Sequence, residues 1–358
     1  MIFLRALLRE FGQLATAVFL TLFLIALTTQ LVRLLGKAAG GKIPSDAVVA
    51  FLGFFALNAL PVLLSLTLFI TVLLTLTRSY RDSEMVVWFS SGLSLTAWIR
   101  PVLLFSLPLV SLIAALSLAI APWTVQMAEK YRSRVDARDD LSRVDPGVFG
   151  ESRSRDRVFF VESVTGDRAT VHNVFVNSVQ HGRNGVMFSK TGTVETAPNG
   201  DRYIVLLDGR RYEGVPGEAE YRVMDFQRYA ARVESATGQE PAPTHKSLST
   251  LALLQHPSNV NRAELLWRIG VPLSALILAL LAIPMSFVNP RAGRSINLLF
   301  ALFTYLVYSN LLTVSQARVA QGRLDFSVGW WLVHAVMLAA VIVLFIRRTS
   351  LRWLKFSN

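Results

Sequence analysis

The sequence contains no cysteine among its 358 residues. This absence excludes disulfide bonds, thiolate metal sites and cysteine catalysis, but it does not identify the compartment of the protein. Charged residues are also scarce: they make up 17% of the chain, whereas soluble domains contain about 25%. Hydrophobic residues account for 53%. This balance predicts a membrane protein.

The common catalytic motifs are also missing. The sequence has no Walker-type phosphate loop, HExxH motif, nucleophile elbow or cluster of paired carboxylates. Charged residues are almost absent from the centres of the apolar segments, which argues against an ion channel or a proton-coupled pump. We expect a non-enzymatic chain that binds no cofactor and takes its energy from a partner. Five histidines lie far apart, without metal-ligand spacing: His172, His181, His245, His256 and His334.

The net charge of +12 is compatible with nucleic acid or with anionic lipid as a partner. Basic residues beside membrane spans suit anionic head groups and the positive-inside rule. A nucleic-acid platform needs aromatic residues interleaved with basic ones, and this pattern is not present. The charge therefore indicates a membrane surface, and we expect no nucleic-acid partner.

Six long apolar segments stand on either side of a polar middle. Each is close to or longer than the ~20 residues that cross about 30 Å of hydrocarbon. The first follows Arg5 and Arg9, is too long for the core of a signal peptide and precedes no small-residue cleavage site, so we expect a retained span. The segments cover 11–32, 48–76, 98–121, 265–288, 296–315 and 328–346.

The segments predict three regions. We expect transmembrane helices 1–3 in residues 1–122, a β domain with helical connectors in 123–263, and transmembrane helices 4–6 in 264–358. In the middle region, short stretches rich in β-branched and aromatic residues alternate with turn signals. The predicted fold is a six-span membrane α-helical protein with an inserted antiparallel β jelly-roll or sandwich domain. The expected strands cover 157–163, 170–177, 185–195, 201–214 and 221–233.

The basic residues of the short loops predict the orientation. With the N-terminus in the cytoplasm, eleven Lys and Arg residues fall on the cytoplasmic side and five on the other. Long segments translocate largely regardless of charge, so the middle domain does not enter this count. We therefore expect both termini in the cytoplasm and the middle domain outside it.

The predicted cytoplasmic loop 77–101 joins the second and third spans and is partly apolar. It has two interpretations: an interfacial connector, or a docking site in which acidic residues lie beside an aromatic patch. The residues of this candidate docking site are Asp82, Glu84, Met85, Trp88 and Phe89.

Basic residues also mark the outer end of the first span. Arg33 and Lys37 lie four residues apart, on one helix face, and Lys42 follows. They either extend to the membrane surface without further function, as is common for such residues, or form a basic rim that attracts an anionic amphiphile.

Four stretches of sequence, taken together with the order of the features above, point to one protein family. SEM with an apolar helix covers 83–89, and LLDGRRYEGVPGEAEYRVMDFQRY covers 206–229. NRAELLWRIGVPLSALILALLAIPMS covers 261–286, and PRAGR covers 290–294. With the arrangement of spans, they resemble the F-type permease subunit of the lipopolysaccharide transport (Lpt) exporter, in the LptF/LptG permease family, over essentially the full length.

The resemblance implies an ABC transporter in which this chain pairs with a G-type permease in the bacterial inner membrane. A cytoplasmic ATPase dimer would use ATP, and a single-span partner with a periplasmic β domain would insert beside the pair. Lipopolysaccharide would enter from the outer leaflet and pass through β domains toward the outer membrane. By the same resemblance, 82–95 is a coupling helix with Glu84 at the ATPase, and Arg33 meets the phosphates of lipid A.

An open β sandwich can shelter acyl chains, while phosphates need Arg or Lys at the rim. Residues at alternating strand positions are the candidate lining, although an ordinary hydrophobic core is the better explanation for any single one of them. They are Phe159, Val161, Val174, Val176, Phe188, Val205 and Leu207.

Two other functions stay open at this point. One is a mechanotransmitting ABC subunit that acts on periplasmic proteins, and the other is a membrane receptor or scaffold whose β domain binds a ligand. Crosslinks to protein alone would favour the first of these, and a cytoplasmic output domain would favour the second.

Overall fold

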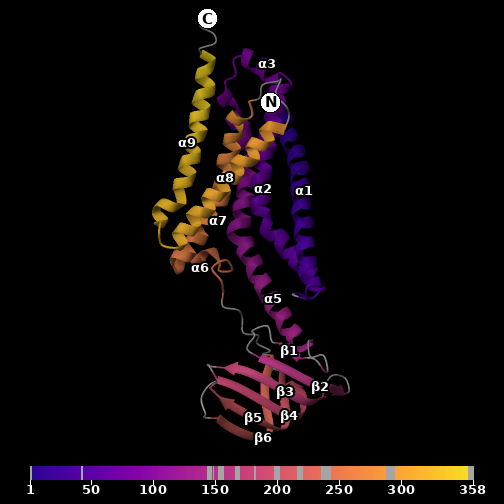
Figure 1. Ribbon diagram of the computed structural model, residues 1–358. Coiled ribbons are helices and arrows are strands. Elements are labelled where there is room, and N and C mark those ends of the chain that lie inside the picture. Colours follow the sequence, from indigo (N-terminus) through magenta and orange to yellow (C-terminus); the bar gives the residue numbers. More distant parts are fainter. Residues whose placement is uncertain are drawn as a thin grey trace. The chain divides into compact units, whose positions relative to one another are not determined.

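The computed structural model describes most of the chain, in two compact units. The first unit comprises Met1–Ala39, Val48–Ala128 and Pro243–Asn358, and the second comprises Gly40–Ala47 and Glu129–Ala242. The first is helical, and the second is built on a β-sheet (Figure 1). The described residues are 2–41, 43–142, 147, 149–151, 157–165, 170–180, 183–196, 202–215, 221–234, 243–287 and 295–353.

The helices follow the predicted spans. A helix bonds all its backbone groups internally, which a segment surrounded by lipid requires. Among the described residues, six helical segments are long and apolar enough to cross a membrane, so the predicted arrangement of three spans, a β domain and three spans is confirmed. The elements are α1 (Ile2–Ala39), α2 (Ala47–Arg81), α3 (Glu84–Ser90), η1 (Leu95–Trp98), α4 (Ile99–Ala115), η2 (Leu116–Ile120), α5 (Ala121–Ser142), α6 (Thr250–Gln255), α7 (Asn259–Met285), α8 (Ser295–Ala320) and α9 (Phe326–Trp353).

The first unit is packed around α7. Of the most apolar stretch of this helix, 72% is buried, and α7 contacts α4, α8 and α9. Ala275, Ala279 and Ala282 are fully buried on it, and such small residues let neighbouring helices approach closely. α1 is the opposite case, because only 6% of its most apolar stretch is buried. Most side chains of this stretch are therefore left for lipid or for another protein to cover.

The second unit contains one antiparallel sheet of six strands in sequence order (Figure 1). The inserted antiparallel β domain is therefore confirmed. The described strands form a meander, and the pairing of sequence-distant strands that defines a jelly roll does not occur among them. The strands are β1 (Phe149–Glu151), β2 (Arg157–Thr165), β3 (Thr170–Gln180), β4 (Arg183–Thr196), β5 (Arg202–Gly214) and β6 (Tyr221–Glu234).

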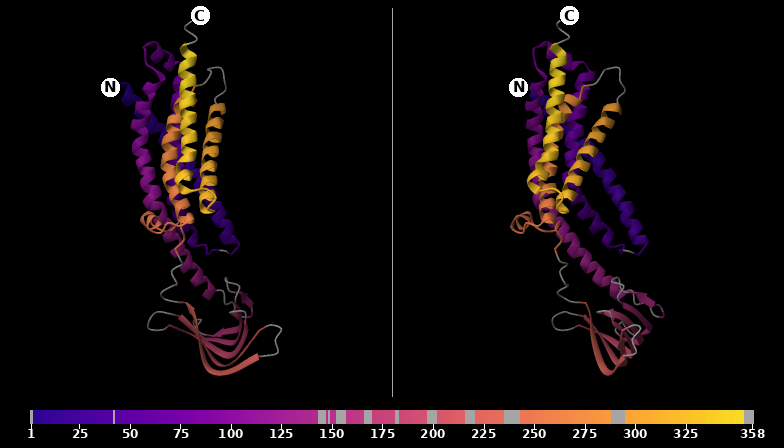
Figure 2. Two further views of the ribbon diagram at one scale, coloured as in Figure 1. Left: turned by 90° about the vertical axis from the view of Figure 1, so that its left-hand side faces the viewer. Right: turned by 60° about the vertical axis from the view of Figure 1, so that its left-hand side comes forward.

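The sheet bends where its pairing is interrupted. Paired positions skip Asn173, Lys190 and Asp208, which lie at the same level of β3, β4 and β5. Asn173 and Asp208 have positive φ angles of 49°, a conformation that Asn and Asp adopt more readily than most residues. The buried Ser189 hydroxyl lies 2.6 Å from Leu207 O and so gives this carbonyl a partner at the bend. Figure 2 shows the resulting strong curvature of the sheet.

The bend also changes which residues share a face. In a regular strand, residues three apart point to opposite faces. Here Val171 and Val174, on either side of Asn173, both pack against Leu206 in one small hydrophobic cluster. The alternation of the sequence is therefore shifted by one residue across the bend.

Candidate functional site

A row of aromatic side chains crosses one face of the sheet. The register aligns Phe149 with Phe160, Phe160 with Phe175, and Phe175 with Phe188. The rings of Phe149 and Phe160 are 4.8 Å apart, and those of Phe175 and Phe188 are 5.0 Å apart. Cross-strand aromatic neighbours stabilise a sheet. These rings nevertheless remain accessible: Phe149 is 65% exposed and Phe188 50% exposed.

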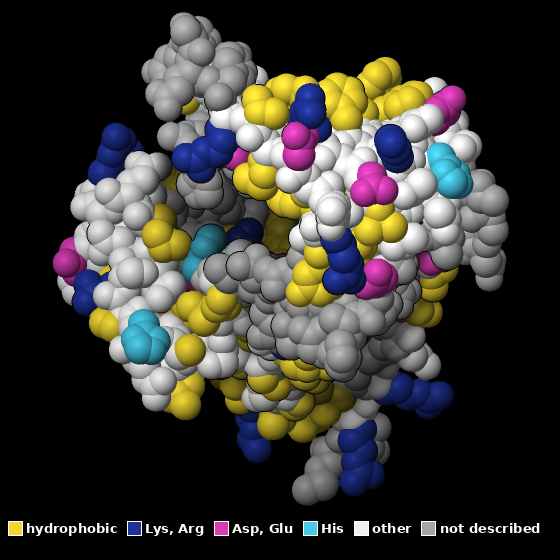
Figure 3. Space-filling model, turned by 90° about the horizontal axis from the view of Figure 1, so that it is seen from below, with side chains coloured by type: hydrophobic (Ala, Val, Ile, Leu, Met, Phe, Trp, Pro, Cys, Tyr) yellow, Lys and Arg dark blue, Asp and Glu magenta, His cyan; other side chains and the backbone are white. Residues whose placement is uncertain are grey.

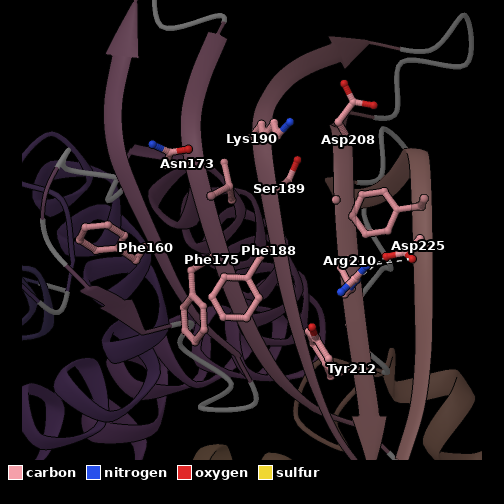
Figure 4. Close-up of a pocket in the computed structure, with 13 residues that line it drawn as sticks. Phe160, Asn173, Phe175, Phe188, Ser189, Lys190, Asp208, Arg210, Tyr212 and Asp225 are labelled. Atoms are coloured by element: carbon pink, nitrogen blue, oxygen red, sulfur yellow. Dashed lines mark hydrogen bonds and ion pairs between the residues drawn. The ribbon is translucent and has the colours of Figure 1, made fainter.

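Three rings of the aromatic row form one side of an open pocket of about 850 Å³. Figure 4 shows Phe160, Phe175 and Phe188 on this side, with polar side chains further along the same strands and on β5 and β6. We call this pocket the sheet groove. It combines an apolar wall with a polar edge, which is the arrangement that an amphiphile requires. The polar edge consists of Asn173, Lys190, Asp208, Arg210 and Asp225.

Arg210 and Asp225 continue the aromatic row on β5 and β6. Their ion pair is bidentate: Nε donates to one carboxylate oxygen, and Nη2 donates to the other at 3.1 Å. The hydrogen bond from Arg210 lowers the pKa of Asp225, and that same bond raises the pKa of the guanidinium. Because both side chains are solvent-exposed, the pair contributes little stability. Lys190 has no ion-pair partner among the described residues and offers its charge to the sheet groove.

Gly209 allows β5 to lie close to β4 and β6 beneath the groove, because it has no side chain. A Cβ added here would lie 2.6 Å from Cε2 of Phe226 and even closer to the carbonyl oxygen of Phe188. The ring of Phe226 packs with the cluster around Val174 and Leu206. Glycine is therefore needed for the close approach of β4, β5 and β6.

The seven predicted lining residues divide between several places. Phe188 lies in the sheet groove, whereas Val176 belongs to the small cluster of Val174 and Leu206, with Val174 also bordering the groove. Val205 is buried outside that cluster, and Leu207 is half-buried. The side chains of Phe159 and Val161 lie outside what the structure describes.

Sequence reasoning missed Phe149, Phe160 and Phe175. The pair Phe159–Phe160 offers an aromatic residue on both faces of β2, so alternation alone does not select the face of the groove. The pairing of Phe160 with Phe175, and of Phe175 with Phe188, would have selected it.

The corner between α2 and α3 is organised by Arg78. Its guanidinium lies 2.9 Å from Glu10 and 3.5 Å from Glu84, so it joins α1 to the start of α3. Asp82 is 3.8 Å from Arg81. All five side chains are at least partly exposed, and such pairs contribute little stability.

The apolar residues of α3 point in two directions. Met85 is 1% exposed, and Trp88 and Phe89 are partly buried against the main core. Val86 and Val87 are 65% and 66% exposed. The three inward-facing residues of the predicted docking set therefore anchor the helix, and the outward apolar surface comes from two valines that the prediction did not include.

The basic end of α1 is exposed. Arg33 and Lys37 flank the buried Leu34, and neither has an ion-pair partner among the described residues. Lys42 lies outside the described residues. Among the described part of the chain, no group of three or more His, Asp or Glu side chains forms a metal site.

Charge is not concentrated on the face of the molecule that is seen from below (Figure 3). Lys and Arg side chains lie there among Asp and Glu side chains, with hydrophobic side chains between them. The described side chains on this face form no continuous basic stripe of the kind that tracks a nucleic-acid backbone.

A family model for the lipopolysaccharide export system permease LptF/LptG matches residues 5–347. The chain belongs to the LptF/LptG permease family. The lipopolysaccharide export system permease protein LptF of Escherichia coli K12 is 30% identical over 96% of this chain and 94% of its own length. The protein of the same name from Shigella flexneri matches equally well.

Membership of the LptF/LptG family confirms the predicted function at its coarser level. The chain is a permease of the lipopolysaccharide export system and a multi-pass protein of the inner membrane. The family implies a paired permease and lipopolysaccharide as the exported substrate, and a permease subunit is consistent with the expectation of a non-catalytic chain.

Proposed function

We propose that the sheet groove receives the acyl chains of lipopolysaccharide after they leave the membrane. The observation that supports this proposal is the row of four aromatic side chains beside an open pocket of about 850 Å³. Large exposed apolar patches on a folded domain mark binding surfaces. Each methylene group that is buried there gains about 0.8 kcal/mol relative to water, so the groove compensates each methylene group that it holds for the hydrocarbon surroundings lost on leaving the membrane.

The chain would then act at two stages of export. At the outer end of α1, Arg33, Lys37 and Lys42 would attract phosphates of lipid A in the outer leaflet. In the β domain, the apolar wall of the sheet groove would hold the acyl chains before they pass to a bridge of periplasmic β domains. This proposal requires both termini in the cytoplasm and the β domain in the periplasm, as the count of basic residues predicts.

The energy would come from a cytoplasmic ATPase dimer that uses ATP, and this chain itself would hold no cofactor. The exposed surface of α3, formed by Val86 and Val87 beside Asp82 and Glu84, suits a partner with an apolar pocket and a basic rim. Met85, Trp88 and Phe89 would fix the position of this surface from below. A single-span partner with a periplasmic β domain would complete the complex with the G-type permease.

ATP-dependent release of lipopolysaccharide from proteoliposomes tests the groove. We expect Phe188→Asp to lower release roughly tenfold, which corresponds to about 1.4 kcal/mol of lost binding, because a carboxylate in the apolar wall opposes acyl chains. Met224→Asp is the matched control, since Met224 is 42% exposed on β6 and does not line the groove. Equal release by the Phe188→Asp variant and the unmodified complex would remove the groove from the export path.

A further inference from the structure

Arg268 in α7 is a buried cation with a partner for each of its donor nitrogens. The side chain is 2% exposed, and that of Glu264, one helical turn earlier, is 8% exposed. A guanidinium has five N–H donors, and five acceptors surround this one. They are Glu264 Oε1, Leu248 O, Thr250 Oγ1 and Lys246 O at 3.0 Å each, and His245 O at 3.4 Å.

The same cluster reaches a second element. The Thr250 hydroxyl, which accepts a bond from Arg268, donates to Leu118 O at 2.5 Å. Ser117 Oγ donates in turn to Arg268 O at 3.0 Å. Ser117 and Leu118 belong to η2, the π-helical turn between α4 and α5. Such turns interrupt the regular ladder of a helix and occur often at functional sites.

These contacts join the two connections of the inserted β domain. The chain leaves the first unit through η2 and α5, and it returns through residues 243–250. Arg268 holds the returning segment directly and the outgoing turn through Thr250 and Ser117. All of these residues belong to the first unit, so the cluster forms a clamp at the base of the insertion.

Stability alone is a weak reason for this arrangement. A buried ion pair loses its hydration, and a well-packed hydrophobic replacement is often equally stable. A fully bonded arginine instead fixes one geometry, because its planar fork meets several acceptors at once. Three of the acceptors here are backbone carbonyls of the short segment 245–248, so the guanidinium fixes the position of this segment relative to α7.

We propose that Arg268 is a positioning residue for export: it clamps the outgoing and returning connections of the β domain to α7, so that a shift of α7 moves both connections together. This proposal rests on the ATP-driven export proposed above. A movement of the membrane helices would thereby act on the β domain through two fixed points rather than through one flexible linker.

The experiment compares variants of the complete permease complex, measuring ATP hydrolysis and lipopolysaccharide release in the same proteoliposomes. Thr250→Val removes the bond to Leu118 O and one acceptor of Arg268, but it leaves the bonds of Arg268 to Glu264 and Leu248 O in place, so we expect the fold to be retained. We expect it to lower the lipopolysaccharide released per ATP hydrolysed about fivefold, the lower end of typical couplings between sites, with hydrolysis unchanged. Thr250→Ser keeps the hydroxyl and should restore the ratio.

The matched control is Thr313→Val in α8, where the hydroxyl only bonds Ser309 O within its own helix. An unchanged ratio in Thr250→Val and in Ser117→Ala/Thr250→Val would overturn the proposal. A parallel loss of hydrolysis, release and assembly would also overturn it, because a merely structural role lowers all three together. Absence of ATP-dependent release by the unmodified complex would instead contradict the proposed function.

Discussion

At the scale of the residue, Gly209 shows how closely the strands beneath the groove approach. The nearest atoms to an added methyl group are those of the Phe226 ring and the backbone oxygen of Phe188. A ring can rotate away, but a backbone carbonyl in the sheet moves only with its strand. The packing at this position is therefore set by the backbone.

We predict that Gly209→Ala destabilises the β domain by about 1–3 kcal/mol, the usual cost of overpacking. Protease resistance of the domain in the purified complex, followed against urea concentration, measures the change. Gly53→Ala in α2 is the control, since a Cβ there has no atom within 4 Å. A midpoint equal to that of the unmodified protein would show that the strands separate more easily than the structure indicates.

At the scale of the element, α3 separates anchoring residues from exposed ones. Met85 is buried, whereas Val86 and Val87 lie on the outer surface near Glu84. The apolar residues of this seven-residue helix lie on both its buried and its exposed side. The composition of the segment therefore predicted an apolar helix, but it did not predict which residues face outward. The structure supplies the face because Trp88 and Phe89 pack inward.

We expect Val86→Ser/Val87→Ser to weaken co-purification of the ATPase, because the exposed apolar surface of α3 is lost. Glu84→Ala should lower lipopolysaccharide-stimulated hydrolysis, since the carboxylate beside that surface is removed. Val49→Ser is the control: it is 77% exposed near the other end of α2. Normal co-purification of the double variant would exclude this face of α3 as the contact.

The end of α1 gives a third prediction at this scale. Arg33→Glu should reduce entry of lipopolysaccharide without affecting assembly, because the exposed cation at the outer end of the helix becomes an anion. Arg33→Lys retains the charge and should retain most of the activity. Lipopolysaccharide release in proteoliposomes checks both variants, and unchanged release by Arg33→Glu would remove this residue from the entry site.

At the scale of the whole molecule, the sequence was sufficient for the arrangement of spans and β domain. An apolar segment of about 20 residues identifies a membrane span without any information on tertiary contacts. The motifs at 206–229 and 261–286 are long enough to identify the family. The lining of the groove was not predictable, because it depends on the register of the strands and on the bend. The positive φ angles at Asn173 and Asp208 shift the alternation by one residue, so that Leu206 lies in the cluster rather than Val205 or Leu207.

The central claim is that acyl chains of lipopolysaccharide lie against the aromatic row of the β domain during export. A photo-crosslinking amino acid in place of Phe188 tests it most directly, in the complete complex with lipopolysaccharide and ATP. We predict an ATP-dependent adduct with lipopolysaccharide at this position and none at Met224, on the same sheet outside the groove. No adduct at Phe188, or an equal adduct at Met224, would contradict the account.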